Sequence, residues 1–201
     1  MNSANASRSE ILSAVRSQKV PVAELPELSG SWISFPDRRK HYSETLGSVG
    51  GTCIEVRDLD ELRAELKKLE PLTAAKKVYS AIPDAALSTF DMEQVADPHE
   101  LEDVDVAIVR GDFAVAENGA VWLTDSQLKH RAILFITQHL VLVVPRDQIV
   151  DNMHRAYERL RFDGRGYGLF LSGPSKTADI EQSLVIGAHG PRSLTVYLLG
   201  E

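Results

Sequence analysis

The stretch TCIEVRDLDELRAELKKLEPLTAAKKVYSA, residues 52–81, decides the fold class of this chain. It begins with the short β-rich run Thr52–Val56 and ends with a second such run, Lys77–Ala81. Between them, Asp58 has the character of a helix N-cap. Four leucines then recur on one helical face: Leu59, Leu62, Leu66 and Leu69. A strand, one helix of roughly thirteen residues and another strand form the pattern of a βαβ crossover, which joins parallel strands.

Further apolar runs extend this pattern to the end of the chain. Such continuous runs, without clean alternation, are typical of strands buried on both faces. The runs are Val104–Arg110, Phe113–Ala116, Val121–Leu123, Ile133–Ile136, Leu140–Val144, Tyr167–Ser172 and Leu194–Leu199. Helices are expected from Asp147 to about Leu160 and over Ala178–Ile186. The sequence therefore predicts an α/β protein with an open, largely parallel sheet covered by helices.

The N-terminal part is less regular. Capping-box spacing at Ser7 predicts a helix of roughly ten residues. A proline-containing stretch follows, and a second helix is expected from Asp37 to about Val49, ending at Gly50-Gly51. We therefore divide the chain into an N-terminal helical and irregular arm, residues 1–44, and a main domain, residues 45–201.

Composition excludes several classes of function. The formal net charge of −7 argues against a general nucleic-acid binder, which needs a basic face. The single cysteine, Cys53, cannot form an internal disulfide or supply the four thiolates of an iron–sulfur cluster. We find no apolar signal region and no apolar run near the ~20 residues of a membrane span. A cytoplasmic protein without a membrane span is expected.

The loop Ser172-Gly173-Pro174-Ser175-Lys176-Thr177 is the strongest candidate binding site. It lies between an expected strand and the N-terminus of an expected helix, where free N–H groups and the helix dipole favour an anion. Lys176 adds a positive charge. The alternative is plain helix capping by Ser175 or Thr177 without a ligand. The loop lacks the second glycine of a Walker A motif, so ATP hydrolysis is not inferred.

Two other loops carry candidate residues. Glu117 follows an apolar run and precedes Asn118-Gly119, where its carboxylate could be a nucleophile or a proton carrier. Asn-Gly between two β-rich runs is also the favoured two-residue hairpin turn, which Glu117 would then only flank. His189, in Gly187-Ala-His-Gly190-Pro191, could be a general base or hold the turn together. No residue pattern indicates a metal site.

Three segments together resemble the lactate-utilization protein C family, a branch of the LUD-domain proteins. They are GDFAVAENG, residues 111–119, SGPSKTADIE, residues 172–181, and GAHGP, residues 187–191. The resemblance implies a Rossmann-like three-layer sandwich similar to the NagB/RpiA/CoA transferase-like fold. It also implies a role in oxidizing L-lactate to pyruvate beside partner proteins that carry the iron–sulfur clusters. Family members often have Glu-Thr-Gly or Glu-Ser-Gly where this chain has Glu117-Asn118-Gly119.

Three functions remain open on this basis. The first is a non-redox subunit or accessory factor of an iron–sulfur lactate oxidation system, without a cofactor of its own, that binds partner proteins or an anionic small molecule. The second is a stand-alone transferase- or isomerase-like enzyme acting on an acyl-CoA or phosphorylated substrate, with Glu117 as nucleophile or base. The third is a regulatory module that senses an anionic metabolite. In each case we expect the three loops, including Asn118, Gly173 and Gly190, to converge on one ligand site.

Overall fold

The computed structural model describes residues 3–18, 23–24, 27–86, 88–126, 128–161, 166–178 and 184–200. The chain divides into two compact units, residues 1–31 and residues 32–201. The first unit holds α1 (Ser3–Ser17), which begins before the expected helix and leaves Ile11 and Val15 exposed. The larger unit begins at Trp32. It therefore includes residues 32–44, which we assigned to the arm.

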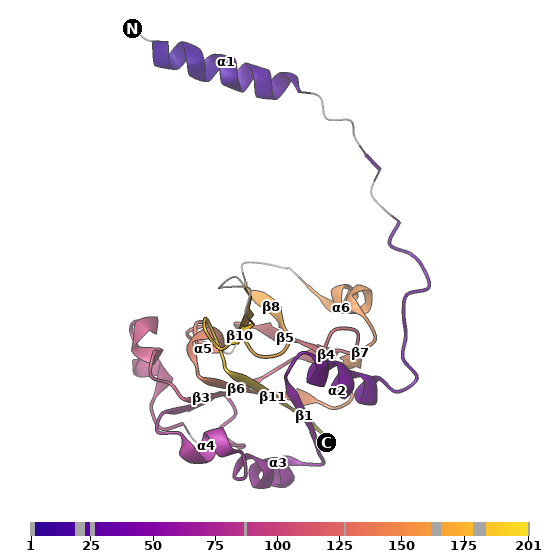
Figure 1. Ribbon diagram of the computed structural model, residues 1–201, viewed down its shortest axis with the longest axis vertical. Helices are drawn as coiled ribbons and strands as arrows, with labels where there is room; N and C mark the ends of the chain where they lie inside the picture. Colours follow the sequence, from indigo (N-terminus) through magenta and orange to yellow (C-terminus); the bar gives the residue numbers. More distant parts are fainter. Residues whose placement is uncertain are drawn as a thin grey trace. The chain divides into compact units, whose positions relative to one another are not determined.

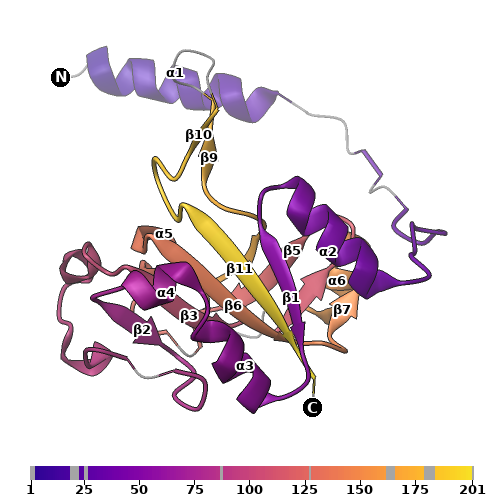
Figure 2. The same cartoon turned by 60° about the horizontal axis from the view of Figure 1, so that its bottom comes forward.

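A five-stranded parallel sheet forms the centre of the larger unit (Figure 2). Its order is β1 (Thr52–Val56), β11 (Ser193–Leu199), β6 (His139–Pro145), β3 (Val106–Arg110) and β2 (Val78–Ser80). All four pairings between neighbours are parallel, which confirms the predicted α/β class.

The crossover in residues 52–81 spans the whole sheet, because β1 and β2 are its two edge strands. Its helical part is broken into α3 (Leu59–Leu66) and α4 (Glu70–Ala74), so the single long helix was wrong. Pro71, in the first turn of α4, explains the break. Proline lacks an N–H and its ring clashes with the preceding turn, so it is tolerated where a helix begins and not inside one.

The two faces of the central sheet pack against different layers (Figure 1). In β6, Val141 and Val143 face α3 and α4, while Leu140, Leu142 and Val144 face the opposite side. That opposite side is covered by α2 (Arg38–Ser48), α5 (Ile133–Ile136) and a second sheet. Asp37, where α2 was expected to begin, is the N-cap of that helix and accepts a hydrogen bond from the Lys40 N–H.

The second sheet has the order β7 (Ile149–Val150), β4 (Phe113–Val115), β5 (Ala120–Thr124) and β8 (Gly168–Leu171). β5 is antiparallel to both β4 and β8. Its outer face packs against α6 (Met153–Arg159). We expected the runs that form β4, β5 and β8 to lie in the same largely parallel sheet, and this part of the expectation was wrong. Apolar runs show that a strand is buried without showing which partner it pairs with.

Two other expectations were also wrong. Residues 133–136 form α5 and no strand. The helix expected from Asp147 is preceded by β7 and begins only at Met153. Most of the helix expected over residues 178–186 lies outside the described residues, which resume at 184; within them, β9 (Lys176–Thr177) and β10 (Val185–Ile186) form an antiparallel pair. Two short 3₁₀ helices, η1 (Met92–Gln94) and η2 (Pro98–Leu101), lie before β3.

Candidate functional site

The loop after β8 is held against the end of α2. Gly173 has a φ of +70°, and a Cβ there would lie 2.6 Å from the Val49 carbonyl oxygen. A side chain would thus be strained by the backbone conformation and would clash with main-chain atoms. The glycine therefore allows this loop to pack directly on the C-terminal turn of α2.

The same loop is hydrogen bonded to the segment that precedes β11. The Ser175 N–H donates to the Pro191 carbonyl oxygen, and the Gly187 N–H donates to the Ser175 carbonyl oxygen, both at 2.9 Å. Gly190 approaches so closely that a Cβ there would lie 3.0 Å from the Ser175 Cβ. The second and third candidate loops thus meet, as the sequence led us to expect.

The first candidate loop touches the second on its other side. Because β4 and β8 are both antiparallel to β5, they run in the same direction and their carboxyl ends lie at one edge of the second sheet. There the Ser172 hydroxyl donates a 2.7 Å hydrogen bond to the Asn118 carbonyl oxygen. The two loops are neighbours through a sheet that the sequence did not reveal.

Glu117 is exposed, and its carboxylate has a structural partner. Its Oε2 accepts a 2.8 Å hydrogen bond from the Met153 N–H, in the first turn of α6. Asn118 Oδ1 accepts from the Ala120 N–H at 3.1 Å. Val115 pairs with Ala120, so residues 116–119 form a four-residue connection and not the two-residue turn. Glu117 thus caps a helix, and it does not line the cavity described next.

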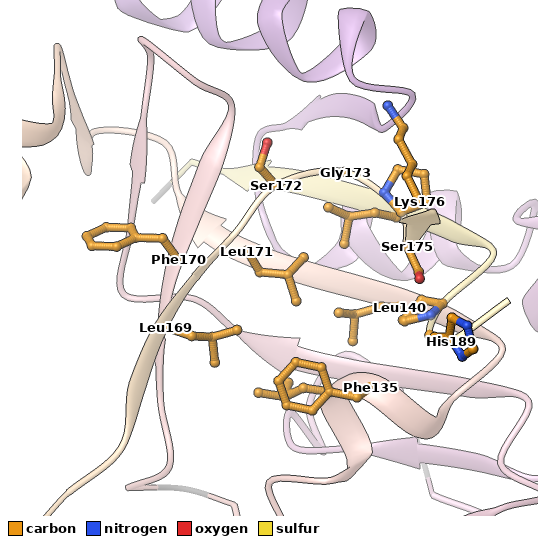
Figure 3. A pocket seen from close by; sticks show the side chains of 15 residues that line it. Phe135, Leu140, Leu169, Phe170, Leu171, Ser172, Gly173, Ser175, Lys176 and His189 are labelled. Atoms are coloured by element: carbon orange, nitrogen blue, oxygen red, sulfur yellow. The ribbon is translucent and has the colours of Figure 1, made fainter. Parts of the chain in front are cut away.

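A cavity of about 350 Å³ opens between the second and third loops, α5 and β8 (Figure 3). Ser172, Ser175, Lys176 and His189 are polar residues of its lining, and the Ser172 hydroxyl is already bonded to the Asn118 carbonyl oxygen. Its wall is mainly apolar and includes Leu134, Phe135, Leu140, Leu169, Leu171 and Leu194. Phe135 and the β8 leucines were missed from the sequence, because no local pattern distinguishes a cavity wall from a core.

Lys176 does not point into this cavity. In Figure 3 its amino group extends away from Phe135 and Leu169. Nζ instead lies 3.7 Å from the position that a Cβ on Gly50 would occupy, just beyond the C-terminus of α2. The partial negative charge of that helix end favours a cation there. Lys176 is therefore not oriented toward a ligand in this cavity as expected, and Thr177 lies in β9.

The position of the cavity also differs from expectation. We expected a ligand loop beyond the carboxyl ends of parallel strands, the usual place in open α/β sheets. The loop follows the carboxyl end of β8, but β8 belongs to the second sheet. In the central sheet the cavity reaches Leu140 and Leu194, which lie at the amino ends of β6 and β11.

A histidine–serine pair lies beside the cavity at the same sheet edge. His139 Nδ1 is 2.8 Å from Ser193 Oγ, and the two residues are cross-strand partners in β6 and β11. Burial lowers the pKa of His139, and the positive charge of Arg192 lowers it further. The pair links two strands. In the described ranges, no group of three or more histidine, cysteine or acidic side chains is arranged to hold a metal.

The fold and the site define an α/β protein with a small-molecule-sized cavity between loops of two different sheets. The family model of the LUD domain matches residues 8–199, and the chain belongs to this family. Among the helices that the structure describes, none is long and apolar enough to cross a membrane.

Two sequence relatives show how far the similarity extends. Lactate utilization protein C of Shouchella clausii is 37% identical over 46% of this chain and 42% of its own length. An uncharacterized protein of Neisseria meningitidis is 27% identical over 85% of this chain and 80% of its own length. The resemblance found in the three sequence segments is thus confirmed. The alignment of this chain with the Shouchella clausii protein spans less than half of that protein's length.

A solved structure supports the fold. A DUF162 family protein from Deinococcus radiodurans, determined at 1.70 Å resolution, superposes with a TM-score of 0.64. The match covers 81% of this chain and 96% of that chain, at 23% sequence identity. At this identity the likeness concerns the fold alone.

Proposed function

We propose that this chain acts in lactate utilization, as a cytoplasmic, non-redox component of an L-lactate oxidation system. The similarity to proteins named lactate utilization protein C carries this proposal. The single cysteine supports the non-redox part, because iron–sulfur clusters usually need four thiolates. The clusters of the proposed system would then be held by partner proteins.

Within this role, the cavity at Ser175 and His189 is the proposed ligand site. Small-molecule sites are typically concave, mostly apolar and supplied with a few polar groups that fix orientation. The cavity has these properties, and it is built from two of the three loops that carry the family resemblance. Its ligand in this proposal is a small carboxylic acid.

The rival function, a transferase with Glu117 as nucleophile, has less support. The Glu117 carboxylate accepts a hydrogen bond from the first turn of α6 and lies outside the cavity lining. A nucleophile should instead face the space that the substrate occupies. The regulatory alternative shares the cavity, and ligand binding without turnover would distinguish it from an enzyme.

A deletion strain tests the proposal in the cell. Loss of this protein should abolish growth on L-lactate and leave growth on pyruvate unchanged. Reintroducing the wild-type gene should restore growth on L-lactate. Affinity-tagged protein from lactate-grown cells should co-purify iron-containing partners in stoichiometric amounts. Normal growth of the deletion strain on L-lactate would contradict the proposal.

The isolated chain tests the non-redox part. Anaerobically purified protein should contain no stoichiometric iron or acid-labile sulfide, and its visible spectrum should lack cluster absorption. Metal analysis of the co-purified complex from lactate-grown cells is the matched control. A cluster in the monodisperse isolated chain would show that the redox division of labour is wrong.

A further inference from the structure

The cavity is polar at one end only. Ser175 and His189 lie on its rim, in the two loops joined through Ser175 and Gly187. The opposite wall is formed by apolar side chains of α5 and β8, among them Phe135 and Leu171. A ligand that fills such a cavity has a polar head and an apolar body.

The volume indicates the size of that body. A water molecule takes up roughly 30 Å³ of liquid, so the cavity of about 350 Å³ corresponds to roughly a dozen such volumes. Lactate and pyruvate have three carbons and only one methyl group. If lactate or pyruvate bound here, most of the apolar wall would stay in contact with water. Binding would then gain little of the free energy that burial of this apolar surface provides.

The rim indicates the chemistry of the head. Among the residues that the structure describes, the Ser175 hydroxyl has no hydrogen-bond partner, and Figure 3 shows it on the same side as His189. The Lys176 amino group extends away from the cavity, so the hydroxyl of Ser175 and the imidazole of His189 are the polar side-chain groups at this rim. Hydroxyl and imidazole donors favour a head that accepts hydrogen bonds, as both oxygens of a carboxylate do.

We infer that the cavity binds a carboxylic acid with a branched or aromatic body in preference to lactate or pyruvate. The carboxylate lies at Ser175 and His189, and the body packs against Phe135 and the β8 leucines. The inference rests on the proposed function only in taking this cavity as the ligand site. It assigns a class of ligand to that site, whereas the name of the relatives does not say which ligand the cavity binds.

A series of acids with one head and growing side chains tests this assignment. Titration calorimetry on the full chain compares L-lactate with leucic acid, its isobutyl analogue, and phenyllactic acid, its benzyl analogue. Each buried methylene strengthens binding by about fourfold, so both larger acids should bind at least about tenfold more tightly than lactate. Equal affinities, or no measurable binding of any of the three, would overturn the inference.

Two variants locate the binding. Phe135 is 42% exposed, so Phe135→Ala should leave the protein folded. It should weaken binding of phenyllactic acid by about tenfold or more and leave that of lactate almost unchanged. Tyr157→Ala, at an aromatic residue that is 60% exposed and outside the cavity, is the matched control and should change neither affinity. Phe135→Leu, which keeps apolar surface, should give an intermediate loss.

Ser175→Ala tests the head. It should weaken binding of all three acids by a similar factor, because the carboxylate is common to them. Wild-type affinity of Phe135→Ala for phenyllactic acid would overturn the inference. The growth and co-purification experiments do not depend on the cavity, so their failure would count against the proposed function alone.

Discussion

The Ser172 hydroxyl donates a 2.7 Å hydrogen bond to the carbonyl oxygen of Asn118. This bond joins the loop after β8 to the connection between β4 and β5, although the two residues are 54 positions apart. Ser175, three residues further along the first of these loops, is bonded in turn to the segment before β11. The loop after β8 therefore links both of its neighbours, and its conformation depends on both contacts.

Replacing Ser172 should loosen this link. Ser172→Ala removes a hydrogen bond to a main-chain acceptor and should lower the free energy of unfolding by ~0.5–1.5 kcal/mol. Ser175→Ala, whose hydroxyl has no partner among the described residues, is the control and should change it by less than ~0.5 kcal/mol. Urea denaturation followed by circular dichroism measures both. Equal losses in the two variants would show that the Ser172–Asn118 bond does not stabilise the fold.

Glu117 should contribute to stability through α6. Glu117→Ala leaves the Met153 N–H without its acceptor and should destabilise the protein by ~0.5–1.5 kcal/mol. Glu117→Gln keeps an acceptor oxygen and should retain most of that stability, losing the ~0.3–1 kcal/mol typical of a negative charge at a helix N-terminus. Thermal unfolding compares the three proteins.

The same two variants address the rival function. A capping role predicts no covalent adduct after incubation with acyl-CoA, and mass spectrometry of the intact wild-type protein would show this. If a glutamyl adduct formed in the wild type and was lost in Glu117→Gln, Glu117 would be a nucleophile and the capping interpretation would be incomplete.

Cys53 should be unreactive at neutral pH. Burial raises the pKa of its thiol to about 11, and the nearby Glu55 carboxylate adds to this while a hydrogen bond with Ser43 opposes it. Because the thiolate is the reactive form, a disulfide reagent should modify the folded protein at pH 8 far more slowly than the unfolded chain. Equal rates in the two states would contradict the raised pKa.

The same shift predicts how stability depends on pH. An unfolded cysteine titrates near pH 8.5, whereas folded Cys53 holds its proton up to about pH 11. Between these values the unfolded chain has released a proton that the folded chain retains, so the free energy of unfolding falls as the pH rises. Cys53→Ala should show a shallower decline over this window. Parallel declines would show that other groups cause it.

Truncation should distinguish the first unit from the segment that follows it. Deleting residues 1–31 should leave the cooperative unfolding of the larger unit intact. Deleting residues 1–36 also removes two hydrogen bonds: one from the Phe35 N–H to the Asp151 carboxylate, and one from the Asn152 side chain to the Ile33 carbonyl oxygen. It further removes the ring stacking between Trp32 and His154. This longer deletion should cost a further ~1–3 kcal/mol. Equal stability of the two truncated proteins would show that these contacts contribute little.

Local sequence signals determined the parts of the fold that depend on local physics. Asp58 lies where the sequence indicates an N-cap, and it accepts a hydrogen bond from the Glu61 N–H. Asp37, at the expected start of the second helix, caps α2 in the same way. Leu62 and Leu66 recur at helical spacing and are buried against the sheet. The inner strands β3, β6 and β11 were found because both of their faces are covered, which leaves continuous apolar runs. The three family segments were also visible in the sequence, since they are defined by residue identity.

Only the tertiary structure decided which strands pair, and therefore what the candidate site is. An apolar run such as Phe113–Val115 reads alike in either sheet, because its pairing depends on residues far away in the chain. Lys176 has the local pattern of an anion-binding residue, but it extends away from the cavity and lies near the end of α2. Glu117 has the pattern of a nucleophile, but a helix 36 residues further on uses its carboxylate as a cap. The sequence determined which residue types are present, and long-range packing determined the space that each side chain faces.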